Sequence, residues 1–265
     1  MPTDILLNVK GGTVFARRWQ PAVTSTTVPL VLLHDSLGCV DMWRDFPGAL
    51  ARQLSRPVIA YDRLGFGRSS PREQLPTADF IREEGEENLP AVLSGLGITD
   101  FALFGHSVGG AMALVAAARA DGRCKAVVSE SAQAFVEDRT FASIREARVR
   151  FQEPDQFNRL EKWHGSKARW VLEAWTKVWL SPEFASWSLE PDLPLVRCPV
   201  LVIHGEEDEY GSIRFPETIS RHIDGLAEMH ILSGCGHVPH RERPDEVAEL
   251  VARFPPLSGG PVVTP

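Results

Sequence analysis

A serine between two glycines, where an apolar run meets a helical segment, is the residue best suited to chemistry in this chain. Residues 101–106 have the composition of a buried strand, and residues 111–119 are typical of a helix. Between them lies Gly105-His106-Ser107-Val108-Gly109, the G-x-S-x-G pattern of a nucleophile elbow. The two glycines permit a strained turn that exposes the serine hydroxyl, and the helix N-terminus offers N–H groups to a developing anion. We expect Ser107 to attack an acyl carbonyl; a plain serine in a glycine-rich turn is the competing interpretation.

A serine nucleophile requires a general base, and the base requires a carboxylate that orients it. Elbows of this kind take their partners in the chain order serine, acid, histidine. Asp208 follows the apolar segment 199–205, and His237 follows the segment 228–232. Each of the three residues therefore lies at the carboxyl end of an expected strand, and we predict that Ser107, Asp208 and His237 meet.

Other residues compete for these roles. His240 shares a loop with His237, and we expect it instead to begin the last helix or to support the loop. His34 and His204 end strands and are interpreted as core histidines, and His106 is held beside the nucleophile. Asp138 is the alternative acid. A run of acids is usually a solvated loop, and three acidic neighbours crowd Asp208: Glu206, Glu207 and Glu209.

Composition excludes several classes of function. The 265 residues are 43% apolar and 24% charged, which predicts one large globular domain with room for an insertion. A net charge of −7 argues against binding to nucleic acid or to an anionic membrane surface. No secretory signal or membrane-length apolar run is visible, so we expect a cytoplasmic protein. Its four cysteines lack C-x-x-C spacing and are expected to be reduced thiols.

Apolar segments alternate with helical ones along most of the chain. Gly11-Gly12 separates two segments, 4–9 and 13–19, that predict an opening β-hairpin. Further strands are expected over 29–34, 57–61, 101–106, 126–131, 199–205 and 228–232, with helices over 42–54, 77–96, 111–119 and 244–254. Short apolar strands that alternate with helices predict a doubly wound α/β sheet.

The alternation breaks after residue 131, where roughly sixty residues pass without a clear strand, too many for a plain loop. We interpret residues 133–192 as a helical insertion. Its rings either form a lid over a ring-bearing substrate or hold a small helical layer on the core. Its basic residues are typical of a solvated helix face; a carboxylate-bearing substrate is the less favoured interpretation. Five of the seven tryptophans lie in it: Trp163, Trp170, Trp175, Trp179 and Trp187.

Several motifs, taken together and in order, resemble those of the α/β-hydrolase superfamily over nearly the whole chain. They are His34-Asp35-Ser36-Leu37-Gly38, Asp62-Arg63-Leu64-Gly65-Phe66-Gly67-Arg68-Ser69, the elbow with Gly110, His204-Gly205-Glu206-Glu207-Asp208, and Gly236-His237. The resemblance implies an eight-stranded, mostly parallel sheet with helices on both faces and a helical cap after the sixth strand. Core segments 1–132 and 193–265 would flank a cap at 133–192, and the Pro/Gly-rich tail, 255–265, is expected to be frayed. The resemblance to the superfamily also implies an oxyanion hole from the N–H groups of Ser36 and Val108, and no metal or organic cofactor.

Within the superfamily, Asp35-Ser36-Leu37-Gly38 is similar to the Asn-Ser-Leu-Gly loop of oxoadipate enol-lactonases. The segment Gly234-Cys235-Gly236-His237-Val238-Pro239-His240 is similar to capped esterases and meta-cleavage-product hydrolases. Asp35 departs from the family glycine and from the lactonase asparagine. It either caps its own loop or faces the pocket, and we favour the pocket. A serine nucleophile argues against dehalogenase or epoxide hydrolase chemistry.

These observations predict a serine hydrolase that acts on a small or medium carboxylic ester or lactone. A carbon–carbon bond hydrolase of a ring-cleavage product is the nearest alternative, and a non-catalytic ligand-binding member of the fold is the alternative from another class. We expect a small-molecule substrate and no nucleic acid or membrane partner, and a homodimer is compatible with the sequence. The expected pocket residues are His34, Asp35, His106, Trp163, Trp170, Trp175 and Trp179.

Overall fold

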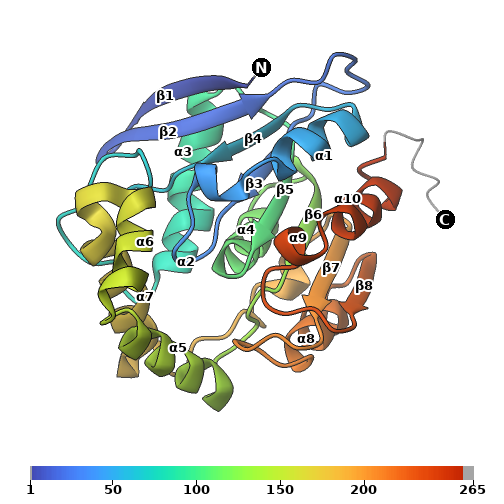
Figure 1. Cartoon of the computed structure of the whole chain (residues 1–265). Coiled ribbons are helices and arrows are strands. Elements are labelled where there is room, and N and C mark those ends of the chain that lie inside the picture. Colours follow the sequence, from blue (N-terminus) through green and yellow to red (C-terminus); the bar gives the residue numbers. More distant parts are fainter. Residues whose placement is uncertain (1, 259–265) are drawn as a thin grey trace.

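Eight strands form one twisted sheet in the order β1-β2-β4-β3-β5-β6-β7-β8 (Figure 1). The computed structural model describes residues 2–258. β1 and β2 pair antiparallel, β2 pairs antiparallel with β4, and all remaining neighbours are parallel. The strands are β1 Thr3–Val9, β2 Gly12–Trp19, β3 Leu30–Leu33, β4 Val58–Tyr61, β5 Phe101–His106, β6 Cys124–Glu130, β7 Val200–Gly205 and β8 Ala227–Leu232. The expected mostly parallel α/β sheet and its opening hairpin are confirmed.

Side-chain alternation along the strands divides the core into two layers. Val31 and Leu33 of β3 pack with the helices of one face, whereas Leu30 and Leu32 pack with those of the other. Because successive side chains of a strand point to opposite faces, a strand buried on both faces is apolar throughout. This is why the central strands lack the polar alternation of a half-exposed sheet.

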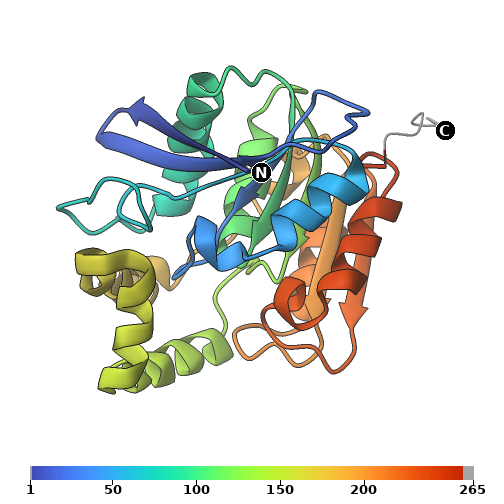
Figure 2. The same ribbon diagram turned by 45° about the horizontal axis from the view of Figure 1, so that its top comes forward.

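Helices cover both faces, as the two views show (Figures 1 and 2). On one face lie α1 Phe46–Leu54 and α10 Pro244–Arg253, with the short α9 Pro239–Glu242 near them. The other face carries α3 Leu89–Gly95, α4 Val108–Ala118 and α8 Arg214–His222. Within the described residues, no helix combines the length and apolar character needed to cross a membrane.

The segment predicted as one helix over 77–96 is interrupted. α2 Phe80–Glu83 continues through a π-helical turn, Glu84–Asn88, into α3. This wide turn coincides with a buried Glu84, whose Oε1 accepts a hydrogen bond from the Tyr61 hydroxyl at 2.5 Å. The wide turn also carries Gly85, where a Cβ would lie 3.1 Å or less from the backbone of α4. Contacts with β4 and α4 therefore coincide with the departure from a regular α-helix, and local sequence does not reveal such contacts.

Residues between β6 and β7 contain three α-helices and no strand of the sheet. They are α5 Asp138–Arg150, α6 Pro154–His164 and α7 Ala168–Trp179. The same segment contains short 3-10 turns at Gly165–Lys167, Pro182–Phe184 and Leu193–Leu195, and a further 3-10 turn, Val40–Trp43, precedes α1. Figures 1 and 2 show α5, α6 and α7 together beside one end of the sheet. The helical insertion after the sixth strand is thus present as the fold class predicts.

The end of the chain corrects one expectation. Fraying was expected over 255–265, and residues 259–265 lie outside the described part. In the described part, Leu257 is fully buried, and its carbonyl accepts a hydrogen bond from the buried Arg56 at 3.0 Å. The apolar side chain fills a gap beside α1 and α10, so the chain stays packed beyond the last helix.

Replacing Gly109 by alanine should destabilise the fold sharply. A Cβ there would lie 2.2 Å from the Leu33 carbonyl oxygen, so β3 and α4 would have to separate. Overpacking of this kind costs roughly 3 kcal/mol, against a helix-propensity gain of about 1 kcal/mol for alanine over glycine. Urea unfolding should show this loss for Gly109→Ala and little change for Gly225→Ala, whose Cβ meets nothing closer than 3.9 Å. Equal stability of the two variants would contradict it.

Candidate active site

Ser107 occupies a strained turn between β5 and α4. Its backbone has φ 56° and ψ −126°, in the left-handed half of conformational space that residues with side chains rarely adopt. The turn is tight because a Cβ at Gly105 would lie 2.1 Å from the Gly109 carbonyl oxygen. The Ser107 N–H donates to the Glu130 carbonyl at 2.8 Å, which ties the turn to β6. The two glycines of the motif are therefore required by close backbone packing.

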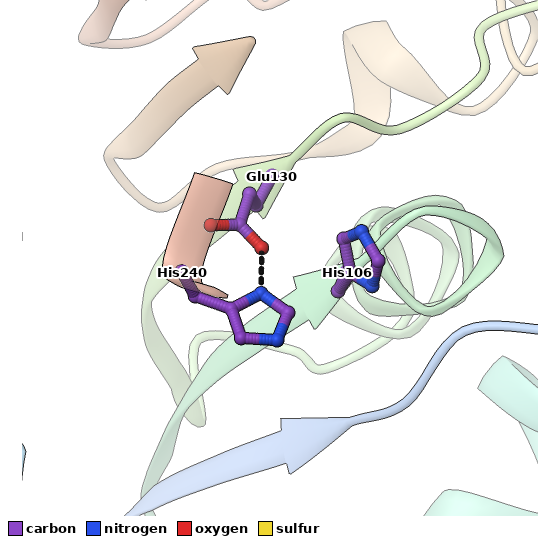
Figure 3. A group of neighbouring side chains, drawn as sticks. All are labelled: His106, Glu130 and His240. Atoms are coloured by element: carbon purple, nitrogen blue, oxygen red, sulfur yellow. Dashed lines mark hydrogen bonds and ion pairs between the residues drawn. The ribbon is translucent and has the colours of Figure 1, made fainter. Parts of the chain in front are cut away.

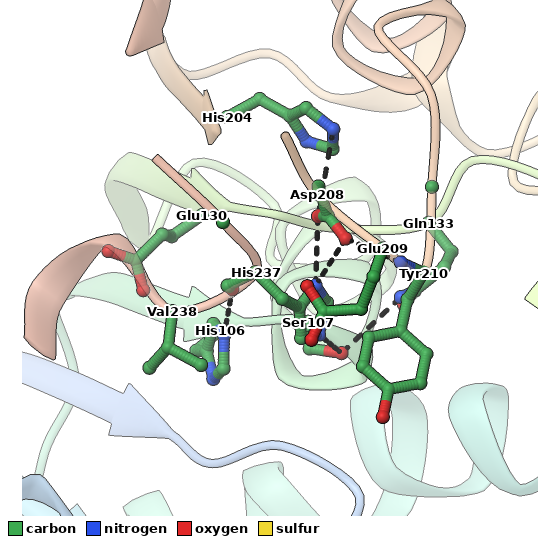
Figure 4. A network of polar contacts seen from close by, with 12 residues as sticks. His106, Ser107, Glu130, Gln133, His204, Asp208, Glu209, Tyr210, His237 and Val238 are labelled. Carbon is green, nitrogen blue, oxygen red and sulfur yellow. Dashed lines mark hydrogen bonds and ion pairs between the residues drawn. The ribbon is translucent and has the colours of Figure 1, made fainter. Parts of the chain in front are cut away.

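A continuous set of hydrogen bonds joins Ser107, His237 and Asp208 (Figure 4). The Ser107 hydroxyl lies 3.0 Å from His237 Nε2, and His237 Nδ1 lies 2.8 and 2.9 Å from the two carboxylate oxygens of Asp208. A carboxylate only accepts, so Nδ1 carries the proton and Nε2 is free to accept from the serine. The structure thus brings together the three residues that the chain order singled out.

Asp208 is buried yet remains suited to ionisation. Burial acts to raise its pKa, but the charge and hydrogen bonds of His237 outweigh burial and hold the pKa below its usual value. The Tyr210 N–H donates a further hydrogen bond to its Oδ1 at 2.8 Å. His204 Nε2 lies 3.6 Å from Asp208 Oδ2, and burial lowers the pKa of His204. Asp208 therefore carries negative charge where it can stabilise a protonated His237.

Helix α5 of the insertion holds the loop that carries Asp208. Arg139 donates to the Asp208 carbonyl at 3.2 Å, Thr140 to the Tyr210 carbonyl at 2.7 Å, and Ser143 to the Glu209 carbonyl at 2.5 Å. Asp138, the alternative acid, is exposed in the first turn of the same helix. Asp138 has no hydrogen bond to His237, whose Nδ1 is occupied by Asp208.

The loop after β3 leaves one of its N–H groups free. The Leu37 N–H donates to the Asp35 carboxylate at 2.7 Å, and the Gly38 N–H to the Asp35 carbonyl at 3.3 Å. The Ser36 N–H between them donates to no described residue, and Ser36 lines the cavity beside Ser107. Val108 is the first residue of α4, so its N–H has no partner within the helix. Within residues 2–258, both expected oxyanion donors therefore have no hydrogen-bond acceptor.

Asp35 combines the two roles that the sequence left open. One carboxylate oxygen caps Leu37 N–H, and the other lies 3.4 Å from His106 Nδ1 while the residue lines the cavity. Burial alone would lower the pKa of His106, but Asp35 and the charge of Glu130 outweigh it and raise this pKa to about 9. Burial acts to raise the Asp35 pKa, yet His106 holds it well below its usual range. The carboxylate is therefore paired with an imidazolium beside the elbow.

His240, the rival base, lies behind this pair and not on Ser107. Its Nδ1 donates to Glu130 Oε2 at 2.6 Å, and Figure 3 shows both beside His106. Burial lowers the pKa of His240 and keeps its ring neutral. The three side chains could in principle surround a metal ion, with ligand atoms within 4.8 Å of one another. However, His106 already contacts Asp35 through Nδ1 and donates from Nε2 to the His237 carbonyl at 2.8 Å. Hydrogen bonds therefore account for the cluster.

A cavity of about 190 Å³ opens beside Ser107 and His237. The insertion contributes Thr140 and Ile144 from α5, and Trp175 and Trp179 from α7. Asp35 is the only carboxylate in this wall as described, and no lysine or arginine belongs to it. Gln133 and Tyr210 lie in the loops after β6 and β7, and this position could have singled them out from the sequence. Sequence reasoning missed six lining residues: Leu37, Met42, Gln133, Thr140, Ile144 and Tyr210.

Gln133 lies closest to the nucleophile among these. Its amide nitrogen is 3.4 Å from the Ser107 hydroxyl oxygen, and the side chain is buried (Figure 4). A donor on that oxygen leaves the hydroxyl hydrogen free to point toward His237. Tyr210 covers His237 from the other side, with ring centroids 4.8 Å apart.

Four expected pocket residues lie elsewhere. His34 is buried under the loop, where Nδ1 contacts the Asp35 carbonyl, and His106 is buried behind the elbow, so neither lines the cavity. Trp163 sits outside it on α6, beside Lys162. Trp170 lines a narrow adjoining space and packs on Gly65, where a Cβ would lie 2.3 Å from its ring. For the two tryptophans the reason is helical periodicity, because only one side of a helix can face the cavity.

The family model for the alpha/beta hydrolase family matches residues 30–250. The serine hydrolase BPHL of Mus musculus is 27% identical over 215 residues, which cover 74% of this chain and 68% of that protein. The 2-hydroxymuconate semialdehyde hydrolase of Pseudomonas putida is 26% identical over 260 residues, or 85% and 86% of the two chains. The enol-lactonase structure from Burkholderia xenovorans LB400 superposes with a TM-score of 0.72 at 19% identity over 94% of this chain and 99% of that one, which shows a shared fold.

The raised pKa of His106 should make stability depend on pH. A protonated group whose pKa rises from about 6.5 unfolded to about 9 folded stabilises the fold fully below pH 6.5 and stops doing so as pH passes 9. The free energy of unfolding of the wild type should therefore fall by roughly 3 kcal/mol more than that of His106→Gln between these pH values. Urea unfolding at pH 6.5 and 9.5 measures the difference. Parallel losses in the two proteins would mean that the ring is already neutral at pH 6.5.

Proposed function

The chain belongs to the alpha/beta hydrolase family, and from that premise we propose that it is a serine hydrolase that cleaves a carboxylic ester or lactone through an acyl-enzyme on Ser107. The observation that carries the proposal is the unbroken hydrogen-bonded series from the Ser107 hydroxyl through His237 to Asp208. It begins at a cavity wall and ends in the protein interior. This is the arrangement that a hydroxyl needs to become a nucleophile near neutral pH.

In the first half-reaction, Ser107 attacks the acyl carbonyl carbon while His237 Nε2 takes the hydroxyl proton. The carbonyl oxygen becomes an oxyanion, which the N–H groups of Ser36 and Val108 stabilise. Asp208 stabilises the imidazolium form of His237 that results. The proton then passes from Nε2 to the oxygen of the leaving alcohol, and the carbon–oxygen bond breaks to leave an ester on Ser107.

In the second half-reaction, His237 accepts a proton from a water molecule, and the hydroxide attacks the acyl-enzyme carbonyl. The same two N–H groups hold the second oxyanion. When this tetrahedral species collapses, the proton on His237 returns to the Ser107 oxygen and a carboxylic acid is released. Each proton thus moves over one hydrogen bond at Nε2.

The cavity supports a small or medium, largely apolar substrate. Its volume of about 190 Å³ and its aromatic wall of Trp175, Trp179 and Tyr210 suit a ring or short acyl chain. In this proposal residues 133–192 act as a cap on the core segments 1–132 and 193–265, since α5 and α7 supply the wall opposite Ser107. The described wall offers no lysine or arginine to an anionic substrate group next to the nucleophile.

Carbon–carbon bond hydrolysis of a ring-cleavage product is the second candidate. The similarity to 2-hydroxymuconate semialdehyde hydrolase favours it, because the same serine, histidine and aspartate can serve both reactions. The cavity wall favours an ester or lactone. An anionic dienoate would lie beside the Asp35 carboxylate, and the described wall contains no lysine or arginine to bind it. Parallel assays with aryl esters, lactones and a vinylogous diketone separate the two candidates.

Removing either end of the proton path should abolish turnover. Ser107→Ala and His237→Ala should each lower kcat on an aryl ester by a factor of about 10⁴ or more, and the double variant should lose little beyond that, because the residues act as a unit. A fluorophosphonate probe should label the wild type at Ser107. Absence of both labelling and hydrolysis would favour a non-catalytic ligand-binding protein. Loss of activity in His240→Ala alone, with His237→Ala active, would reassign the base.

The orienting carboxylate should be separable from its rival by a matched pair of variants. Asp208→Asn removes the acceptor that fixes the His237 tautomer, a change worth about 10⁴ in kcat in serine proteases. Asp138→Asn alters an exposed residue of α5 and should stay near wild-type activity. Steady-state kinetics on one ester suffices, and equal mild losses in both variants would remove Asp208 from the proton path.

A further inference from the structure

The peptide group between Asp35 and Ser36 is fixed at one end and free at the other. Its carbonyl oxygen accepts hydrogen bonds from Arg63 Nη2 at 2.7 Å and from His34 Nδ1 at 2.8 Å. Its N–H, that of Ser36, donates to no described residue and belongs to a residue of the cavity wall. The Gly38 N–H, at 3.3 Å, is a third and longer donor to the same oxygen. Three donors therefore hold the far end of the peptide group whose N–H is left for a ligand oxygen.

Arg63 is an unusual donor for this position because its charge has no counter-charge in contact. The side chain is only 6% exposed, and no carboxylate oxygen of the described residues lies within 4.0 Å of it. Its Nη1 reaches only the Met112 sulfur at 3.6 Å, and its guanidinium carbon lies 4.4 Å from the Phe66 ring centroid. The bond to the Asp35 carbonyl is thus its shortest hydrogen bond.

His34 completes the support. The backbone N–H of Arg63 donates to His34 Nε2 at 3.2 Å, which leaves Nδ1 as the protonated nitrogen that faces the Asp35 carbonyl. Burial lowers the pKa of His34 well below its usual value, so the ring stays neutral and keeps this tautomer. Arg63 therefore acts on the same carbonyl directly and through His34.

A cation that donates to a peptide carbonyl has two effects on the N–H at the other end. It fixes the plane of the peptide group, and it withdraws electron density so that the N–H becomes a stronger donor. Burying a charge without a carboxylate in contact is costly, and burial lowers the pKa of Arg63 although the more distant charges of Glu84 and Asp35 act to raise it. Neither effect requires Arg63 to touch the substrate.

We propose that Arg63 is a positioning residue of the oxyanion hole, which holds and polarises the Asp35–Ser36 peptide group so that the Ser36 N–H stabilises the oxyanion. This role rests on the proposed function, because it takes the Ser36 N–H as one of the two oxyanion donors. It gives Arg63, in the turn after β4, a part in the reaction although it lies outside the cavity beside Ser107.

The test compares two buried arginines that each donate to a carbonyl. Arg56 is 4% exposed and donates to the Leu257 carbonyl in the core layer under α1 and α10. Loss of one direct oxyanion donor lowers kcat by about 10²–10³, so loss of its support through Arg63→Met should lower kcat on an aryl ester by about 10- to 100-fold with KM nearly unchanged. Arg56→Met should keep wild-type kcat, whatever its melting temperature.

Conservative variants keep the proposal testable if Arg63→Met folds poorly. Arg63→Lys retains the charge but offers a single donor point in place of the planar fork, so it should recover part of kcat. Arg63→Gln retains a donor without the charge and should recover less. Circular dichroism at the assay temperature shows whether each variant is folded. A folded variant of any of these with wild-type kcat, or one that raises KM alone, would overturn the role.

Labelling by a fluorophosphonate distinguishes failure of this role from failure of the proposed function, because its phosphoryl oxygen must enter the same oxyanion hole. The wild type should be labelled at Ser107, and Arg63→Met about 10- to 100-fold more slowly. Equal labelling rates would overturn the role of Arg63 alone. A wild type that is neither labelled nor active on esters would overturn the proposed function and this role with it.

Discussion

The close approach of β3, β5 and α4 at the elbow is the constraint on which the rest of this molecule depends. A Cβ added at Gly105 would overlap the Gly109 carbonyl oxygen, and one added at Gly109 would overlap the Leu33 carbonyl oxygen. The strands and the helix therefore meet through their backbones, almost without side chains between them. That contact forces Ser107 into its left-handed conformation. It also puts the start of α4 beside the loop after β3, so that the N–H groups of Ser36 and Val108 belong to one region. A looser junction would leave the serine without its anion-stabilising surroundings.

The carboxylates of Asp35, Glu130 and Asp208 around the elbow each contact a histidine. Asp35 is paired with the His106 imidazolium, which offsets its charge, and Glu130 accepts a hydrogen bond from the neutral ring of His240. Asp208 is matched by His237. Arg63 has no carboxylate in contact among the described residues, and its shortest hydrogen bond runs to the loop that carries Ser36. Arg63 thus places a positive charge against the loop that carries Ser36.

The helical insertion is fastened to the core on two sides of the cavity. Helix α5 binds the carbonyls of the loop that carries Asp208. On the other side, His164 accepts a hydrogen bond from the Gly67 N–H and donates one to the Leu37 carbonyl. Lys167 donates to the carbonyls of Phe66 and Gly67 in the turn after β4. The basic residue Lys167 thus serves structure, in contrast to the solvated face expected of it. Because the insertion supplies Trp175 and Trp179, the same contacts that hold it in place define the cavity.

Local sequence determined the strands, the elbow and the order of Ser107, Asp208 and His237, because strand length, apolar runs and glycine spacing act over a few neighbouring residues. It favoured His237 over His240, which lies three positions further on, but it could not show the contacts that separate them, since only the fold places Asp208 against one ring and Glu130 against the other. Nor could it tell which tryptophans face the cavity, or that Arg63 reaches the Asp35 carbonyl 28 residues away. Those outcomes depend on side-chain direction and on contacts between segments distant in the chain, and such contacts exist only once the sheet and insertion have packed.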